Sequence, residues 1–172
     1  NNLQIKDEAV TAAWSEVQNQ YQRRADLVPN LVNVVKGYAK HEEQVLTEVT
    51  QARANVAGLK VDKEVLEDPA LFQKYQEAQA QMTGALSRLI AVSENYPDLK
   101  ANEQFRDLQV QLEGTENRIA VARNRYISTV QDFNSYARQF PQVMTAKVIG
   151  MDTKPNFSAE KKEKKAPTVS FN

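Results

Sequence analysis

The sequence predicts an all-α protein: an up-and-down antiparallel four-helix bundle of long helices, followed by an extended C-terminal tail. Two observations support this class. Five glycines and six prolines are few for 172 residues, and they lie mostly between apolar-periodic segments. Within those segments apolar side chains recur every three or four residues, the spacing of one helix face. The expected elements are one helical domain over 1–149, with helices near 3–26, 29–57, 69–95 and 102–140 and a short helix near 142–149, and an extended basic tail over 150–172.

The first helix is predicted from a single apolar stripe. Its members are Leu3, Val10, Trp14, Val17 and Tyr21. We expect this helix to end near residue 26, because Pro29 disfavours helical geometry at Val28. One helix that continues through Pro29 is the alternative, since a proline in a first turn and a proline inside a helix look alike in sequence.

The second and third helices are each predicted from a heptad seam. The second seam is formed by Val28, Leu31, Val35, Tyr38, Glu42, Val45, Val49, Ala52 and Val56. The third is formed by Phe72, Tyr75, Gln79, Met82, Leu86, Leu89, Ser93 and Tyr96. Gly58 follows the second seam, where a helix end favours glycine. Asp68 and Pro69 open the third helix as an N-cap followed by a residue whose missing N–H costs nothing there.

The last long helix has the clearest periodicity in the chain. Its seven-residue repeat is formed by Phe105, Leu112, Ile119, Tyr126, Phe133 and Phe140, with Leu108, Thr115, Ala122, Thr129 and Tyr136 between them. This is the a/d seam of a coiled coil. Pro141 then ends the helix.

Composition excludes several classes of function. Lys and Arg total 22 and Asp and Glu total 22, so no basic field attracts nucleic acid, and we expect no nucleic-acid partner. The absence of cysteine excludes disulfides and thiolate ligands, and the single histidine leaves few options for an imidazole base. No run approaches the roughly 20 apolar residues of a membrane span. Because the chain begins at Asn1 and not at methionine, we expect an upstream segment to have been removed.

Polar residues interrupt the seams at Glu42, Gln79 and Thr115. These residues could line a polar cavity, together with Glu116, Asn117 and Arg118, which follow Thr115. The preferred interpretation is a hydrogen-bonded buried layer that fixes helix register.

Two charged groups invite functional hypotheses that we rank below structural ones. His41 and Glu42 suggest a metal site, but a carboxylate-bridged di-iron bundle requires two Glu-x-x-His pairs, so we expect no metal. Arg23 and Arg24 could bind phosphate or a lipid headgroup. Capping of the first helix and ion pairing are preferred for them. We expect no catalytic residue and no cofactor.

The tail carries KKEKK at 161–165, which is interpreted as a solvated linker, with contact to anionic lipid as the alternative. Val169 and Phe171 lie beyond it and are candidates for docking in a bundle groove, either of their own domain or of a partner.

Three runs resemble the signatures of the LemA family. They are AWSEVQNQYQRRADLVPNLVNVVKGYAKHEEQVLTEVTQAR over 13–53, YPDLKANEQFRDLQVQLEGTENRIAVARNRYISTVQDFNSYARQFP over 96–141 and APTVSF over 166–171. The resemblance implies a helical bundle in the bacterial cell envelope, extracytoplasmic (periplasmic) and anchored by an N-terminal transmembrane helix or a lipoprotein signal that this chain lacks. It implies no established catalytic activity.

We therefore expect a non-catalytic, membrane-anchored interaction, scaffold or adaptor module of the envelope, with envelope stress or membrane-protein quality control as its candidate processes. Its expected partner is an unidentified envelope or membrane protein, with a membrane protease system as one candidate. A hydrolase or lipid-handling enzyme with a site between helices is the main alternative. A structural organiser of the membrane surface is the third hypothesis.

Overall fold

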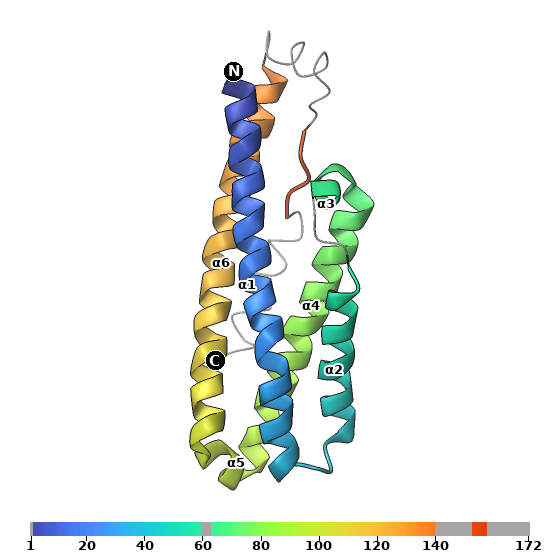
Figure 1. Ribbon diagram of the computed structural model, residues 1–172, viewed down its shortest axis with the longest axis vertical. Helices are drawn as coiled ribbons and strands as arrows, with labels where there is room; N and C mark the ends of the chain where they lie inside the picture. The colour runs from blue at the N-terminus through green and yellow to red at the C-terminus, as the bar shows by residue number, and fades with distance from the viewer. Residues whose placement is uncertain (1, 60–62, 140–152, 158–172) are drawn as a thin grey trace.

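The computed structural model describes residues 2–59, 63–139 and 153–157, which form an elongated helical bundle (Figure 1). The long helices are α1 (Asn2–Tyr38), α2 (Glu43–Ala57), α4 (Pro69–Val92) and α6 (Glu103–Arg138). The short elements between them are α3 (Lys63–Glu67), the 3₁₀ turn η1 (Ser93–Asn95) and α5 (Pro97–Ala101). No strand occurs in the described ranges, and the all-α class predicted from sequence is confirmed.

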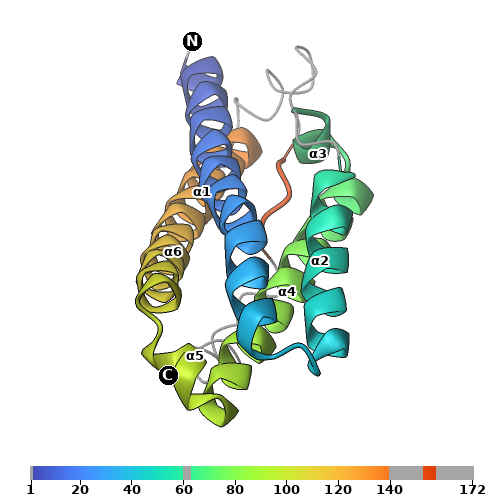
Figure 2. The same cartoon turned by 60° about the horizontal axis from the view of Figure 1, so that its bottom comes forward.

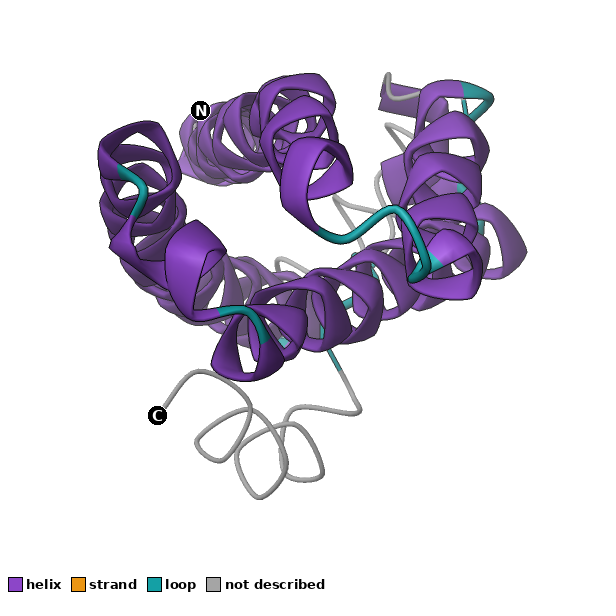
Figure 3. Cartoon of the chain, turned by 90° about the horizontal axis from the view of Figure 1, so that it is seen from below, coloured by secondary structure: helices purple, strands orange, loops and turns teal. Residues whose placement is uncertain are grey.

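The long helices form two antiparallel pairs that face each other across the core. α1 packs along α6, and α2 packs along α4 (Figures 1 and 2). The turn at 39–42 and helix α5 lie at one end of the bundle, which we call the turn end; Figure 3 views the molecule from this end. Asn2 and Arg138 lie at the opposite end, which we call the aromatic end.

α1 continues through Pro29, so the predicted break near 26–29 is wrong and the alternative of one continuous helix is correct. Proline has no N–H for the carbonyl four residues earlier, which here belongs to Ala25. Arg53 of α2 donates its Nε–H to that Ala25 oxygen at 3.3 Å. The oxygen therefore keeps a partner, and burial of Val28 and Leu31 on either side of the proline holds the helix against its neighbours.

The predicted helix over 29–57 is interrupted instead at 39–42, where the chain reverses from α1 into α2. The Glu42 N–H donates to the Ala39 carbonyl at 3.1 Å and closes this turn, and Gly37 just before it weakens the last turn of α1. The seam predicted across 28–56 therefore belongs to two antiparallel helices. Tyr38 is 42% exposed and Glu42 precedes α2, so neither is a seam residue.

Two predicted helix starts are confirmed in atomic detail. The Asp68 carboxylate accepts from the Ala70 N–H at 2.9 Å, and Pro69 occupies the first helical position. The Asn102 side chain accepts from the Phe105 N–H at 2.9 Å and caps α6. The connections predicted over 58–67 and near 96–98 are not wholly irregular, because they contain α3 and α5.

One of the two seam positions of α6 shifts by one residue in the last third of the helix, while Phe133 is buried as predicted. Residues up to Tyr126 follow the predicted heptads, but Val130 and Ala137 are buried where Thr129 and Tyr136 were expected. Two consecutive four-residue steps, 122 to 126 to 130, produce the shift. A straight helix of 3.6 residues per turn drifts away from a strict seven-residue repeat, and the four-residue step corrects for that drift.

The core is divided into two apolar clusters. The cluster at the turn end is aliphatic in the main and takes residues from all four long helices, with Leu31, Val49, Leu86 and Leu112 among them. The cluster at the aromatic end contains no residue of α2. It is completed by Val65 and Leu66 of α3 and by Phe157.

The short helix predicted at 142–149 and the tail over 158–172, with KKEKK, Val169 and Phe171, lie outside the described residues. Within the predicted tail, 153–157 is non-helical and packs on the bundle.

Candidate functional site

A buried arginine lies at the boundary between the two apolar clusters. Arg24 is 1% exposed and comes from the middle of α1, since this helix continues for 14 residues beyond it. The capping role predicted for Arg23 and Arg24 is therefore wrong: neither lies at a helix terminus. Arg23 is exposed on the same helix.

The guanidinium of Arg24 connects three helices. Nη1 donates to Thr83 Oγ1 at 2.7 Å and to Glu116 Oε1 at 3.0 Å. Nη2 donates to the Gln79 side-chain oxygen at 2.8 Å and to the Gln79 carbonyl at 3.0 Å. We call Arg24, Gln79, Thr83 and Glu116 the arginine layer. Its ion pair is partly shielded from water, because the Glu116 side chain is 15% exposed.

Aromatic side chains border the arginine layer on the side of the aromatic end. The Arg24 guanidinium carbon lies 5.0 Å from the centre of the Tyr21 ring, and that ring lies 5.8 Å from the Tyr75 ring. Burial, followed by the neighbouring Tyr21, raises the pKa of Tyr75 well above its ordinary value of 10, against a smaller opposing effect of Arg24. The side-chain hydrogen bond between Tyr75 and Gln79 also lowers the pKa, but by less than burial raises it.

Most polar groups of the arginine layer are hydrogen-bonded, but the neighbouring side chain of Gln76 has no hydrogen-bond partner among the described residues. Gln76 lies one turn before Gln79 on α4 and is 7% exposed, and neither of its amide atoms has a hydrogen-bond partner among the described residues. An unpaired buried amide costs about 1–3 kcal/mol. Within the arginine layer, Arg24 Nε is buried without a hydrogen-bond partner among the described residues.

The remaining residues of the predicted polar layer are only partly brought together. Gln79 and Glu116 both bind Arg24. Thr115 is buried, but its hydroxyl donates to the Gln111 carbonyl at 2.8 Å within α6. Asn117 and Arg118 are exposed.

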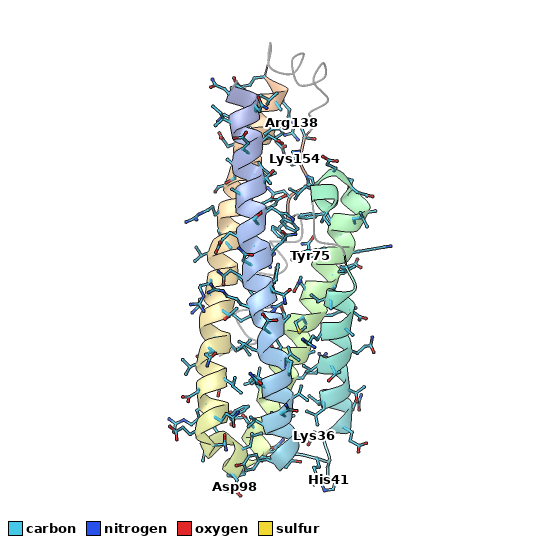
Figure 4. All side chains as sticks on the ribbon, viewed as in Figure 1. Lys36, His41, Tyr75, Asp98, Arg138 and Lys154 are labelled. Atoms are coloured by element: carbon cyan, nitrogen blue, oxygen red, sulfur yellow. The ribbon has the colours of Figure 1, made fainter. Side chains whose placement is uncertain are left out.

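Glu42 lies far from this layer, at the turn end, where it accepts a hydrogen bond from the Tyr96 hydroxyl at 3.3 Å. Burial of the hydroxyl and the Glu42 carboxylate raise the pKa of Tyr96. His41 is exposed in the same turn (Figure 4). Across 2–59, 63–139 and 153–157, no three His, Asp or Glu side chains converge as a metal site requires.

Sequence reasoning missed the burial of Arg24, although a signal for it exists. Val17, Tyr21, Arg24, Val28 and Leu31 follow one another at helical steps of four, three, four and three residues. Only the assumed break near 26 removed Arg24 from that stripe. A continuous helix predicts a buried arginine, which requires an acidic partner from another helix.

Sequence reasoning also missed the segment over 153–157, which we call the docked segment. Phe157 is 5% exposed, and its ring lies 5.3 Å from the Phe72 ring and 5.6 Å from the Tyr126 ring. Trp14 lies against the same two rings at 5.5 and 5.3 Å. The docked segment passes between α6 and the α3–α4 side of the bundle, and it supplies the ring that completes the aromatic cluster (Figure 1).

Two open grooves run along the outside of the helix pairs. The larger, about 660 Å³, lies between α2 and α4; Ala52 and Ala85 are among its lining residues, with Gln44, Gln51 and Gln81 beside them. The smaller, about 280 Å³, lies between α1 and α6 and is lined by Glu16, Gln20 and Arg125 among others. None of the described helices is long and apolar enough to cross a bilayer.

Fold and site together define an all-α bundle in which a buried arginine layer hydrogen-bonds α1, α4 and α6 to one another. Residues 13–171 match the LemA family, and the chain belongs to that family. It is also similar to Protein LemA of Metamycoplasma hominis, with 25% identity over 135 residues, which is 78% of this chain. The matched region spans 58% of that relative's length. The LemA family is not known as a family of enzymes.

Proposed function

We propose that this protein is a non-catalytic interaction module of the bacterial cell envelope, tethered to the membrane and presenting helix surfaces to a membrane protein. Membership of the LemA family supports an envelope-associated role of this kind. The structural observation that carries the proposal is the groove between α2 and α4. It is open along two rigid helices, and Ala52 and Ala85 offer little side-chain bulk there.

The chemistry of that groove favours a protein partner over a substrate. Its polar lining includes amides such as Gln44 and Gln81 and the ion pair between Arg88 and Glu48, 2.8 Å apart. These groups are spread along the two helices. An enzyme site holds a few polar groups that converge on one point. Amides arranged in a line next to small side chains instead suit the backbone and side chains of a helix or an extended strand.

The arginine layer supports the same proposal by giving the bundle rigidity. A guanidinium with partners on three helices fixes how α1, α4 and α6 sit against each other. A partner that reads a fixed surface loses little free energy to reorganisation on binding. We place envelope stress and the control of membrane-protein quality, including a membrane protease system, among the processes in which such an adaptor acts.

Site-specific photo-crosslinking from the full-length, anchored protein in its own cells tests the proposal. A crosslinkable residue at Gln44 or Gln81 in the groove is expected to give a discrete adduct with a membrane protein. The matched control is the same residue at Asn124, which is exposed on α6 and lies outside the groove. Adducts of equal yield from all three positions, or none from the groove, would contradict the proposed function.

A further inference from the structure

The docked segment is held on α6 by hydrogen bonds to its backbone, as extended peptide ligands are held. Lys154 donates its N–H to the Asn134 side-chain oxygen at 2.7 Å, and its carbonyl accepts from the Asn134 side-chain nitrogen at 3.1 Å. One amide side chain on α6 thus pairs with both backbone groups of one extended residue. Such main-chain pairing gives affinity for extended peptides without regard to their side chains.

Two further backbone and side-chain contacts continue this alignment along α6. The Tyr126 hydroxyl donates to the Pro155 carbonyl at 2.9 Å. The Asn156 side chain donates to the Ile127 carbonyl at 3.3 Å. A proline inside the peptide suits this site, because none of these contacts uses an N–H at that position and the ring holds the backbone extended.

Two side chains of the docked segment, Lys154 and Phe157, make specific contacts with the bundle. The Lys154 ammonium lies 3.0 Å from the Asp7 carboxylate of α1, with side-chain exposures of only 14% and 22%, and 5.5 Å from the centre of the Phe133 ring. The Phe157 ring enters the aromatic cluster beside Phe72 and Tyr126. The Arg123 guanidinium covers its outer face at 4.4 Å. These contacts suit a cation followed, three residues later, by an aromatic ring.

We propose that this surface is a peptide-recognition site for extended segments with the pattern Lys-Pro-x-Phe, and that the chain's own residues 153–157 occupy it as a competing internal ligand. The proposal deepens the proposed function, since it rests on the protein being an interaction module and names the chemistry of a peptide that the module binds. A tethered ligand is present at an effective concentration in the millimolar range, so a free peptide with the same contacts competes poorly until the internal one is weakened.

The test uses the full chain carrying Lys154→Ala and Phe157→Ala. These changes remove the two anchoring side chains of the internal ligand and leave the residues of the bundle that contact it unchanged. The probe is a fluorescently labelled synthetic peptide covering residues 151–160. We expect saturable binding to the variant, followed by fluorescence anisotropy, and binding at least ten times weaker to the unaltered chain. A peptide carrying the Phe157→Ala change, and a receptor that also carries Asn134→Leu, are each expected to lose binding at least tenfold.

Circular dichroism establishes that the variant is folded, and Lys154→Ala alone, which keeps the aromatic ring, replaces the double variant if it is not. No saturable binding to a folded variant would overturn the inference, and so would equal affinity for the variant and the unaltered chain. Both measurements are independent of any envelope partner. Loss of the groove crosslinks with peptide binding retained would therefore count against the proposed function alone.

Discussion

The two halves of the bundle share α1, α4 and α6 but are closed in different ways. At the turn end α2 supplies Leu46, Val49 and Ala52, and the core is a close-packed set of mainly aliphatic side chains. At the aromatic end α2 is absent, and α3 with the docked segment takes its place against large rings. The comparison teaches that a short non-helical segment and a one-turn helix can close a bundle where the fourth long helix is absent.

The arginine layer separates these halves, and its removal is expected to have the largest effect. Arg24→Met leaves Glu116, Gln79 and Thr83 without their shared donor inside the bundle. We expect the free energy of unfolding to fall by about 3–5 kcal/mol, as when one partner of a buried ion pair is deleted. Urea denaturation measures it. The triple variant Arg24→Met, Gln79→Leu, Glu116→Leu should recover part of the lost stability. A loss below about 1 kcal/mol for Arg24→Met alone would contradict this account.

The next contrast compares one large apolar side chain from each half. Leu86→Ala at the turn end opens a cavity between fixed helices, and about 3 kcal/mol of stability should be lost. Phe157→Ala at the aromatic end should cost only about 1–2 kcal/mol, because release of the docked segment limits the loss.

Hydrogen exchange distinguishes the two effects. Leu86→Ala should raise exchange rates throughout the bundle. Phe157→Ala should raise them only in the first half of α1, the second half of α6 and the start of α4. Uniform acceleration in both variants would show that the halves do not differ in this way.

Two glutamines one turn apart on α4, at the boundary between the two apolar clusters, allow a paired and an unpaired buried amide to be compared. Gln79→Leu removes an acceptor from the Arg24 guanidinium, and a loss of about 2 kcal/mol is expected. Gln76→Leu removes an amide that has no partner in the described part of the chain, and a gain of about 1 kcal/mol is expected. Thermal unfolding should rank the two variants on opposite sides of the unaltered protein, and equal losses would disprove the distinction.

Alkaline pH should act on the aromatic end first. Burial raises the pKa of both Tyr75 and Tyr126 in the folded state, whereas both ionise near 10 in the unfolded chain. The folded state therefore holds more protons above pH 10, and stability is lost as pH rises from there. The slope is about 1.4 kcal/mol per pH unit for each tyrosine. Urea denaturation at pH 9 and 11 should show a smaller loss of unfolding free energy for the Tyr75→Phe, Tyr126→Phe double variant than for the unaltered protein. An equal loss in both proteins would refute the assignment to these two tyrosines.

Local signals in the sequence determine much of the fold, and contacts between distant residues determine the rest. Asp68 with Pro69 starts α4 by contacts within four residues, so the pattern alone predicted it. The continuity of α1 depends on Arg53, which is 28 residues from the carbonyl that it satisfies. The partner of Arg24 lies 92 residues away. Neither contact is visible in any local window. The break near 26 was predicted from Pro29 alone, without the Arg53 contact that satisfies the Ala25 carbonyl.

The candidate site was predicted in part for the same reason. Gln79 was recognised because it interrupts an apolar seam, and Glu116 because it follows the interruption at Thr115; both are local properties. Phe157 follows Pro155 in a polar stretch that predicts no element, and only the assembled rings of α1, α4 and α6 give it a place to bind. Val169 and Phe171 remain predictions.

The start of α1 and the end of α6 lie side by side at the aromatic end, where Leu3 and Ala137 belong to the same apolar cluster. Under mechanical tension between the two ends, the pair would open like a zipper, one contact at a time, and would not resist as a sheared interface. The pair between Lys6 and Asp132, 2.6 Å apart, and that between Asp7 and Lys154 are among the first contacts in the path of that force. Tension would thus release the docked segment before it reached the arginine layer, and the turn end would stay folded.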